Sequence, residues 1–201
     1  MDDAIGIVLL DHIPLGIDRV PAAGSHCAHV AAGRRDQCLW ASASDITCPL
    51  GRFNLGLDPQ DDPVVETLIA TLLEWGYAAD PTVARYFISG LVPIPHGDPI
   101  LVYGPPDRLP HEPDITLRIV TPEAAMRWII GSAGSSGVRA IGDMSGLGAV
   151  CGECTAFPLR SGRACVSVGC PGSRRELALD PTELLLAIPR AQERVLPLDV
   201  L

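Results

Sequence analysis

The chain contains no lysine, so all fifteen of its basic residues are arginine. This absence excludes a P-loop lysine and a lysine that forms a Schiff base with its substrate. Aromatic residues are also few, with three each of Trp, Tyr and Phe, which leaves little surface on which nucleic-acid bases could stack. A net charge of −9 argues further against nucleic acid as a partner.

Membrane-spanning and secretory patterns are missing as well. The first residues are acidic, and the apolar run from Ile5 to Leu10 ends at Asp11, so we expect neither a signal peptide nor a membrane span. The sequence therefore predicts a cytoplasmic protein with no membrane partner. In a reducing compartment the seven cysteines are interpreted as metal ligands, redox thiols or buried apolar residues before structural disulfides.

What the chain does have is a repeat in which each copy begins with cysteine. Segment 48–59, Cys-Pro-Leu-Gly-Arg-Phe-Asn-Leu-Gly-Leu-Asp-Pro, aligns without a gap with segment 170–181, Cys-Pro-Gly-Ser-Arg-Arg-Glu-Leu-Ala-Leu-Asp-Pro, and seven of the twelve positions are identical. Upstream, Cys27 and Cys38 are eleven residues apart, and so are Cys154 and Cys165. We interpret this pattern as an internal duplication within one domain, residues 1–201, with halves of roughly 1–95 and 96–201.

Each copy of the repeat places a thiol directly before a proline. Proline fits best in the first turn of a helix, where its missing N–H is not needed, so Cys48 and Cys170 are predicted helix caps. The unpaired N–H groups and the positive end of the helix dipole favour the anionic form of a thiol there. Both cysteines are therefore candidate thiolates, the form that binds metals or attacks electrophiles.

Strands and helices alternate along the chain. Apolar runs predict strands at 5–10, 37–42, 100–103, 114–120 and 164–168. Cap-and-proline pairs predict helices that begin at Asp62, Asp80, Thr121 and Asp180, the last of them running through Ala187. A glycine- and serine-rich stretch, 131–148, is expected to be a flexible connector or lid. The fold class is α+β, possibly α/β, as a single compact domain with weak internal two-fold symmetry.

Two copies of a two-cysteine unit supply four thiolates, which suit an iron–sulfur cluster or a structural zinc. Zinc ribbons use two Cys-x-x-Cys knuckles and this chain has one, Cys151 to Cys154, so the spacing favours a cluster held by dispersed cysteines. Residues 155–158, Thr-Ala-Phe-Pro, are a poor helix continuation, which disfavours a thioredoxin-like dithiol. The pattern leaves open which of the two knuckle cysteines is the ligand.

Several short motifs follow one another along the chain: Cys27 followed by Ala-Ala-Gly, Cys48-Pro49, Val102-Tyr103-Gly104-Pro105, Pro113-Asp114, Cys151-Gly152-Glu153, the run from Val168 to Arg174, and Ala187-Ile188-Pro189. Their order resembles domain of unknown function family 169, an uncharacterised family common in archaea and anaerobic bacteria. The resemblance implies a fold but no established activity. It also implies that Cys27, Cys48, Cys151 and Cys170 are the recurring cysteines and that the other three are peculiar to this chain.

Three charged residues are further candidates for the site. Arg52 and Arg174 recur at one repeat position, where they could offset the charge of a cluster or hold an anionic ligand. The alternative is a repeated ion pair with the aspartate of each Leu-x-Leu-Asp-Pro. Glu153 is a candidate general base or oxygen ligand, and its alternative is a solvated loop carboxylate.

The sequence thus predicts a [4Fe–4S] cluster held by Cys27, Cys48, Cys151 and Cys170, with zinc as the alternative metal and Cys154 as the alternate ligand. Such a cluster would transfer electrons or act as a Lewis acid on a small anionic substrate. Two alternatives stay open. One is a metal-free enzyme with Cys48 or Cys170 as nucleophile, and the other is a non-catalytic module that binds a small molecule while its cysteines pack.

Overall fold

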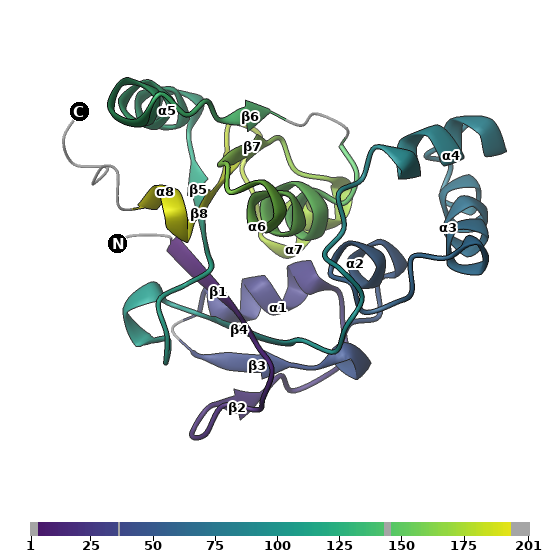
Figure 1. Cartoon of the computed structure of the whole chain (residues 1–201), viewed down its shortest axis with the longest axis horizontal. Helices are drawn as coiled ribbons and strands as arrows, with labels where there is room; N and C mark the ends of the chain where they lie inside the picture. Colours follow the sequence, from purple (N-terminus) through teal and green to yellow (C-terminus); the bar gives the residue numbers. More distant parts are fainter. Residues whose placement is uncertain (1–3, 36, 143–145, 194–201) are drawn as a thin grey trace.

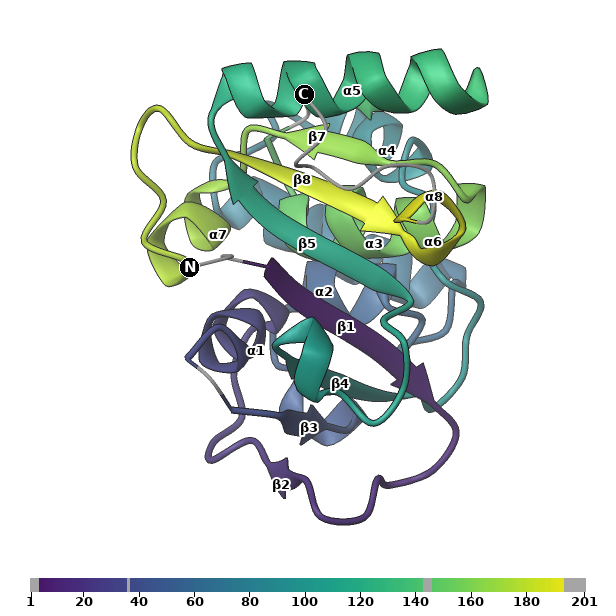
Figure 2. The ribbon, with the colours of Figure 1, turned by 90° about the vertical axis from the view of Figure 1, so that its left-hand side faces the viewer.

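The computed structural model describes residues 4–35, 37–142 and 146–193. Its centre is a mixed sheet with strand order β2-β3-β4-β1-β5-β8-β7-β6, most of which can be followed from bottom to top in Figure 2. The strands are β1 (Ala4–Leu10), β2 (Asp18–Arg19), β3 (Leu39–Ala41), β4 (Ile100–Gly104), β5 (Ile115–Val120), β6 (Ile141–Gly142), β7 (Cys165–Ser167) and β8 (Leu184–Pro189).

Most of the connections between these strands contain helices. The α-helices are α1 (His26–Gly33), α2 (Pro49–Asn54), α3 (Asp62–Glu74), α4 (Pro81–Ser89), α5 (Pro122–Ser136), α6 (Phe157–Ser161), α7 (Pro171–Glu176) and α8 (Arg190–Glu193). Two short 3-10 helices, η1 (Ala43–Asp45) and η2 (Pro106–Arg108), and a π-helix, η3 (Ala149–Ala156), complete the secondary structure. Within the described ranges, every helix is too short or too polar to cross a bilayer.

The sheet has the same succession of parallel and antiparallel strand pairs when it is followed inward from either edge. At its centre β1 and β5 pair antiparallel, and β4 and β8 flank them, each antiparallel to its central neighbour. Farther out, β3 and β7 are again antiparallel to β4 and β8, and the outermost strands, β2 and β6, are each parallel to their neighbours. The elements 4–104 and 115–189 therefore follow one plan about a pseudo-two-fold axis between β1 and β5. The division at residue 95 remains a prediction from the sequence.

The two faces of the sheet carry different layers. Side chains of β8 alternate, so that Leu185 and Ala187 belong to the main core with α1 and η3, whereas Leu186 and Ile188 pack with Trp128 of α5. One face is thus covered by α1, α2, η3, α6 and α7, and part of the other by α5 (Figure 1). The helices on the first face carry most of the predicted site residues.

The first half of the chain has an addition that the second half lacks. Helices α3 and α4 lie between α2 and β4 in sequence and project beyond α2 at the right of Figure 1. Helix α3 begins where the Asp61 carboxylate accepts the N–H of Val64, with Pro63 in the first turn, and buries Leu68 and Leu72 in a separate core with α2 and α4. This unit forms one wall of the site described below.

Most sequence-based expectations of secondary structure are confirmed, as is the α+β fold class. The predicted helix from Asp180 to Ala187 is wrong, because the apolar run becomes strand β8 between β5 and β7, where both of its faces are buried. The glycine- and serine-rich stretch is in part helix α5, which continues to Ser136, and in part strand β6; its residues 143–145 lie outside the described residues. Residues 155–158 do continue a helix, through η3 into α6.

Candidate functional site: a pocket lined by four cysteines

One cavity of about 580 Å³ lies where the two halves of the chain meet on the helical face of the sheet. The four cysteines selected by the family resemblance all line this cavity, although they lie far apart in the sequence. Cys27 is on α1, Cys48 precedes α2, Cys151 is in η3, and Cys170 precedes α7. Each half therefore supplies two of the sulfur atoms.

The two Cys-Pro turns have the same backbone. Cys48 and Cys170 are both N-cap residues in extended conformation, and each is followed by proline in the first helical turn. The carbonyl of Cys48 accepts the N–H of Arg52 at 2.9 Å, and that of Cys170 accepts the N–H of Arg174 at 2.9 Å. The predicted helix caps are confirmed, and the caps direct both sulfur atoms toward the same pocket.

The two capping sulfurs differ in their hydrogen bonds. The Cys170 sulfur accepts a hydrogen bond from the Cys27 thiol and one from the backbone N–H of Ser173, at 3.4 Å. The bond from Cys27 is the largest cause that lowers the pKa of Cys170, to about 4. For Cys48, burial outweighs two backbone hydrogen bonds and raises the pKa of the thiol. The expectation of a thiolate therefore agrees with Cys170, whereas Cys48 stays protonated near neutral pH.

The other two sulfurs form the buried floor of the pocket. The pKa of Cys27 is raised well above its ordinary value by the bond it donates to Cys170 and by burial. Burial is the largest cause that raises the pKa of Cys151, whose sulfur accepts a contact from the Asn54 side-chain amide at 3.7 Å. Nearby cysteines appear among the electrostatic influences on both groups, which shows that the four sulfurs share one environment.

A buried histidine joins the two helices that carry the floor. The Thr155 hydroxyl donates to the carbonyl of Val150 at 2.7 Å, so it accepts from His26 Nε2, at 3.1 Å. The Nδ1 atom of His26 then accepts from the Tyr103 hydroxyl at 2.9 Å. Burial lowers the pKa of His26 to about 3, so the imidazole is neutral. This network fixes α1, with Cys27 next to His26, against η3.

Cys154, the alternate ligand, does not line the pocket. Its side chain is fully buried in the main core, and this burial is the largest cause that raises its pKa, followed by the neighbouring Cys165. Because η3 is a π-helix, three positions cover less than one turn, so Cys151 and Cys154 project from different faces and only Cys151 lines the cavity. The structure thus favours Cys151 where the sequence left the choice open.

Glu153 is neither solvated nor part of the cavity lining. The side chain is 3% exposed, and the Ser167 hydroxyl donates to its carboxylate. The same hydroxyl accepts the N–H of Gly169 at 3.1 Å, directly before Cys170. The alternative of a solvated loop carboxylate is therefore wrong, and Glu153 holds the loop that carries Cys170.

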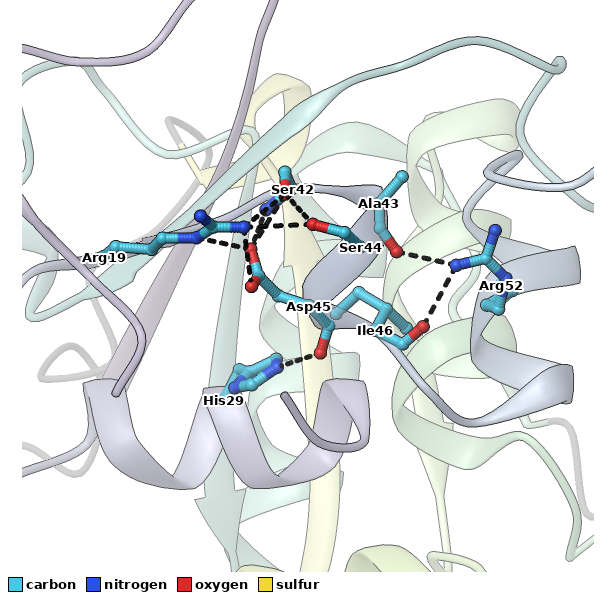
Figure 3. A network of polar contacts seen from close by, with 8 residues as sticks. All are labelled: Arg19, His29, Ser42, Ala43, Ser44, Asp45, Ile46 and Arg52. Carbon is cyan, nitrogen blue, oxygen red and sulfur yellow. Dashed lines mark hydrogen bonds and ion pairs between the residues drawn. The ribbon is translucent and has the colours of Figure 1, made fainter. Parts of the chain in front are cut away.

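Arg52 and Arg174 also lie outside the cavity lining. Arg52 pairs with Asp58 and donates to the carbonyls of Ala43 and Ile46, as Figure 3 shows for the two carbonyls. Arg174 donates to the carbonyls of Val168 and Asp180, both at 2.6 Å. The repeated ion pair is present only in the first copy, and both guanidinium groups hold their own turns in place rather than facing the sulfurs.

The sequence did not indicate the residues at the mouth of the pocket. Trp75, Tyr77 and Arg175 line its mouth, each of them substantially exposed. Arg175 could have been found from the repeat alignment, because it stands where the first copy has Phe53. A cation in place of a core residue signals that this side of the second turn is open to solvent.

Among the described residues, no three His, Cys, Asp or Glu side chains lie close enough together to hold one metal ion. A tetrahedral zinc site needs four sulfurs about 2.3 Å from a single point. A cluster distributes its ligands over several irons, so its cysteines surround a larger volume. Four thiols around one cavity fit the second requirement better than the first.

The chain was also compared with known proteins. It matches the family described as uncharacterised ArCR, domain of unknown function family 169, over residues 3–195, and it belongs to this family. An uncharacterised protein of Methanocaldococcus jannaschii is 24% identical over 182 residues, which cover 89% of this chain and 77% of that protein. No solved structure matches the chain.

Proposed function

We propose that this family member binds an iron–sulfur cluster through Cys27, Cys48, Cys151 and Cys170 and that it acts as a redox protein of the cytoplasm. The observation that carries the proposal is the cavity itself, because four cysteines separated by up to 143 positions of sequence line one pocket. All seven cysteines are free thiols, which suits a reducing compartment. Zinc remains the alternative metal.

Electron transfer fits this ligand set better than Lewis-acid chemistry. A metal that activates a substrate needs an open coordination position, and four cysteine ligands leave none. When bound, the cluster would supply one-electron chemistry, with a potential set by the groups around its sulfurs. The chain offers N–H groups for this purpose, from the Asn54 amide toward Cys151 and from the Ser173 backbone toward Cys170.

The test is anaerobic purification followed by a visible absorption spectrum and by iron, acid-labile sulfide and zinc analysis. We expect a coloured protein with iron and sulfide, and we expect Cys48→Ser and Cys170→Ser to lose both. The matched control is Cys38→Ser, because Cys38 lies outside the cavity lining and donates instead to the carbonyl of Arg108. Colour that survives Cys48→Ser, or zinc without sulfide, would contradict the proposal.

A second candidate is metal-free thiol chemistry at Cys170. It is favoured by one observation, the bond that the Cys27 thiol donates to the Cys170 sulfur inside an accessible pocket. A colourless protein with a single fast-reacting thiol at Cys170 would support this candidate. Neither metal nor a reactive thiol would leave a module that binds a small molecule.

A further inference from the structure

The pocket has a mouth whose chemistry differs from that of its floor. Cys27 and Cys151 at the floor are buried, whereas Trp75 and Tyr77 at the mouth are 44% and 41% exposed. Between floor and mouth the lining is largely apolar, with Leu50 and Leu147 among the side chains. A cavity of about 580 Å³ falls within the size range of sites that bind small organic molecules.

The position of the two aromatic residues is set by the end of α3. Trp75 is the C-cap, and Gly76 follows with φ of +70°, a left-handed conformation that glycine adopts without strain. The N–H of Tyr77 then bonds to the carbonyl of Leu72 at 2.9 Å, and that of Gly76 to Leu73 at 3.0 Å, which is a Schellman motif. The two rings meet edge to face with centroids 6.1 Å apart, so they form a defined apolar surface.

A positive charge lies at this mouth. Arg175 is the only cationic side chain among the described residues that line the cavity, although the chain as a whole carries a net charge of −9. Its guanidinium pairs with the adjacent Glu176, with 77% of the Arg175 side chain exposed. Surface pairs of this kind contribute little energy, so the guanidinium can exchange this partner for another anion.

We propose that the mouth of the pocket binds small organic anions with a flat apolar body. The acid group pairs with Arg175, and the apolar body packs against Trp75 and Tyr77. Carboxylates attached to an aromatic ring have this combination. The ligand would lie above the sulfur floor, and its assignment as the substrate class of a redox centre rests on the proposed function, whereas its binding does not.

The experiment measures binding of benzoate and of its neutral counterpart benzamide to the full chain by titration calorimetry. We expect benzoate to bind about tenfold more tightly than benzamide, and Arg175→Gln to remove that preference, because a charge-assisted hydrogen bond is lost. Arg175→Lys should restore part of it. Trp75→Leu should weaken both ligands. The matched control is Arg127→Gln, since Arg127 on α5 is also an exposed arginine in one surface ion pair.

Iron and sulfide are measured on the same samples, so the two proposals can fail separately. Equal binding of benzoate and benzamide, no binding of either, or an unchanged benzoate affinity in Arg175→Gln would overturn the assignment of the mouth, whatever the metal content. A benzoate preference that depends on Arg175 in a protein without iron would support the mouth site and contradict the cluster.

Discussion

In the first half of the chain the Cys-Pro turn lies beneath α3 and α4, whereas in the second half the same turn is open to solvent. Phe53 in the covered turn is 5% exposed and packs in the core of α2, α3 and α4. Its counterpart in the open turn, Arg175, lies at the mouth of the pocket. The comparison shows that cysteine, proline and leucine preserve the turn, while the remaining positions follow their surroundings.

The two turns also differ in the residue at the third position after the cysteine, which can cap the start of the helix. Ser173 in the open turn accepts the N–H of Cys170 at 2.8 Å through its hydroxyl and donates its own N–H to the sulfur. The covered turn has Gly51 at this position, which has no side chain to offer. One backbone thus presents a sulfur with a reciprocal cap and a sulfur without one. The cap adds to the hydrogen bond from Cys27, which is the largest cause of the lowered pKa of Cys170, whereas burial raises the pKa of Cys48.

The largest predicted effect is on stability at the covered turn. Gly56 has φ of +70°, and a Cβ there would lie 2.4 Å from the carbonyl oxygen of Pro95. We expect Gly56→Ala to lower the free energy of unfolding by about 3 kcal/mol, from strain and overpacking together. Gly76→Ala is the matched control, since φ is also +70° but nothing lies within 4 Å, and it should cost about 1 kcal/mol. Chemical denaturation measures both, and equal losses would contradict the role of the clash.

A smaller effect is expected on thiol reactivity in the metal-free protein. At pH 5 Cys170, with a pKa of about 4, is mostly thiolate, whereas Cys48 is almost wholly protonated. A low-pKa thiolate is intrinsically less nucleophilic, which offsets part of this advantage, so we expect alkylation by iodoacetamide on the order of tenfold faster at Cys170. The difference should close toward neutral pH as the Cys48 thiolate accumulates. Peptide mapping by mass spectrometry gives both rates.

A substitution that gives the open turn the glycine of the covered turn tests this comparison. Ser173→Gly removes the hydroxyl of the reciprocal cap, so the pKa of Cys170 should rise and its labelling at pH 5 should slow. Labelling of Cys48 serves as the internal reference. An unchanged ratio of the two rates would show that the Ser173 hydroxyl does not contribute to the lowered pKa of Cys170.

The smallest predicted effect is a gain in stability. Ala178 occupies the position of Gly56 in the open turn and has φ of 52°, the one positive φ of a non-glycine residue in the described chain. Ala178→Gly should raise the free energy of unfolding by about 0.5 kcal/mol, because relief of strain exceeds the added entropy of the unfolded chain. A shift of the denaturation midpoint at constant m-value is the measurement, and a loss of stability would contradict the assignment.

Local signals in the sequence predicted the parts of this fold that depend on local chemistry. The Asp80 and Thr121 caps and the prolines after Cys48 and Cys170 begin helices as expected, since the cap bonds are made within a few residues. The helix expected from Asp180 is instead a turn and strand β8, because a short apolar run satisfies either structure and the neighbouring strands decide between them.

The same distinction applies to the site. Repeat and resemblance together predicted four cysteines that line one cavity. For Arg52 they offered two roles, and the structure has the ion pair with Asp58. They could not place Arg174, because the carbonyls that it contacts are chosen by the shape of the turn. Nor could they find Trp75, whose place at the mouth depends on how α3 packs across the junction of the two halves. Residues that act through tertiary packing carry no sequence signal within their own segment.

The symmetric order of the sheet has a consequence for the origin of the site. An antiparallel pair at the centre, β1 with β5, is what two identical half-length chains would form by joining edge to edge about a two-fold axis. Such an ancestor would have held two sulfurs per subunit, and the complete set of four would have formed only at concentrations that favour the dimer. Fusion into one polypeptide makes that encounter intramolecular, which removes the dilution penalty and frees each copy to diverge.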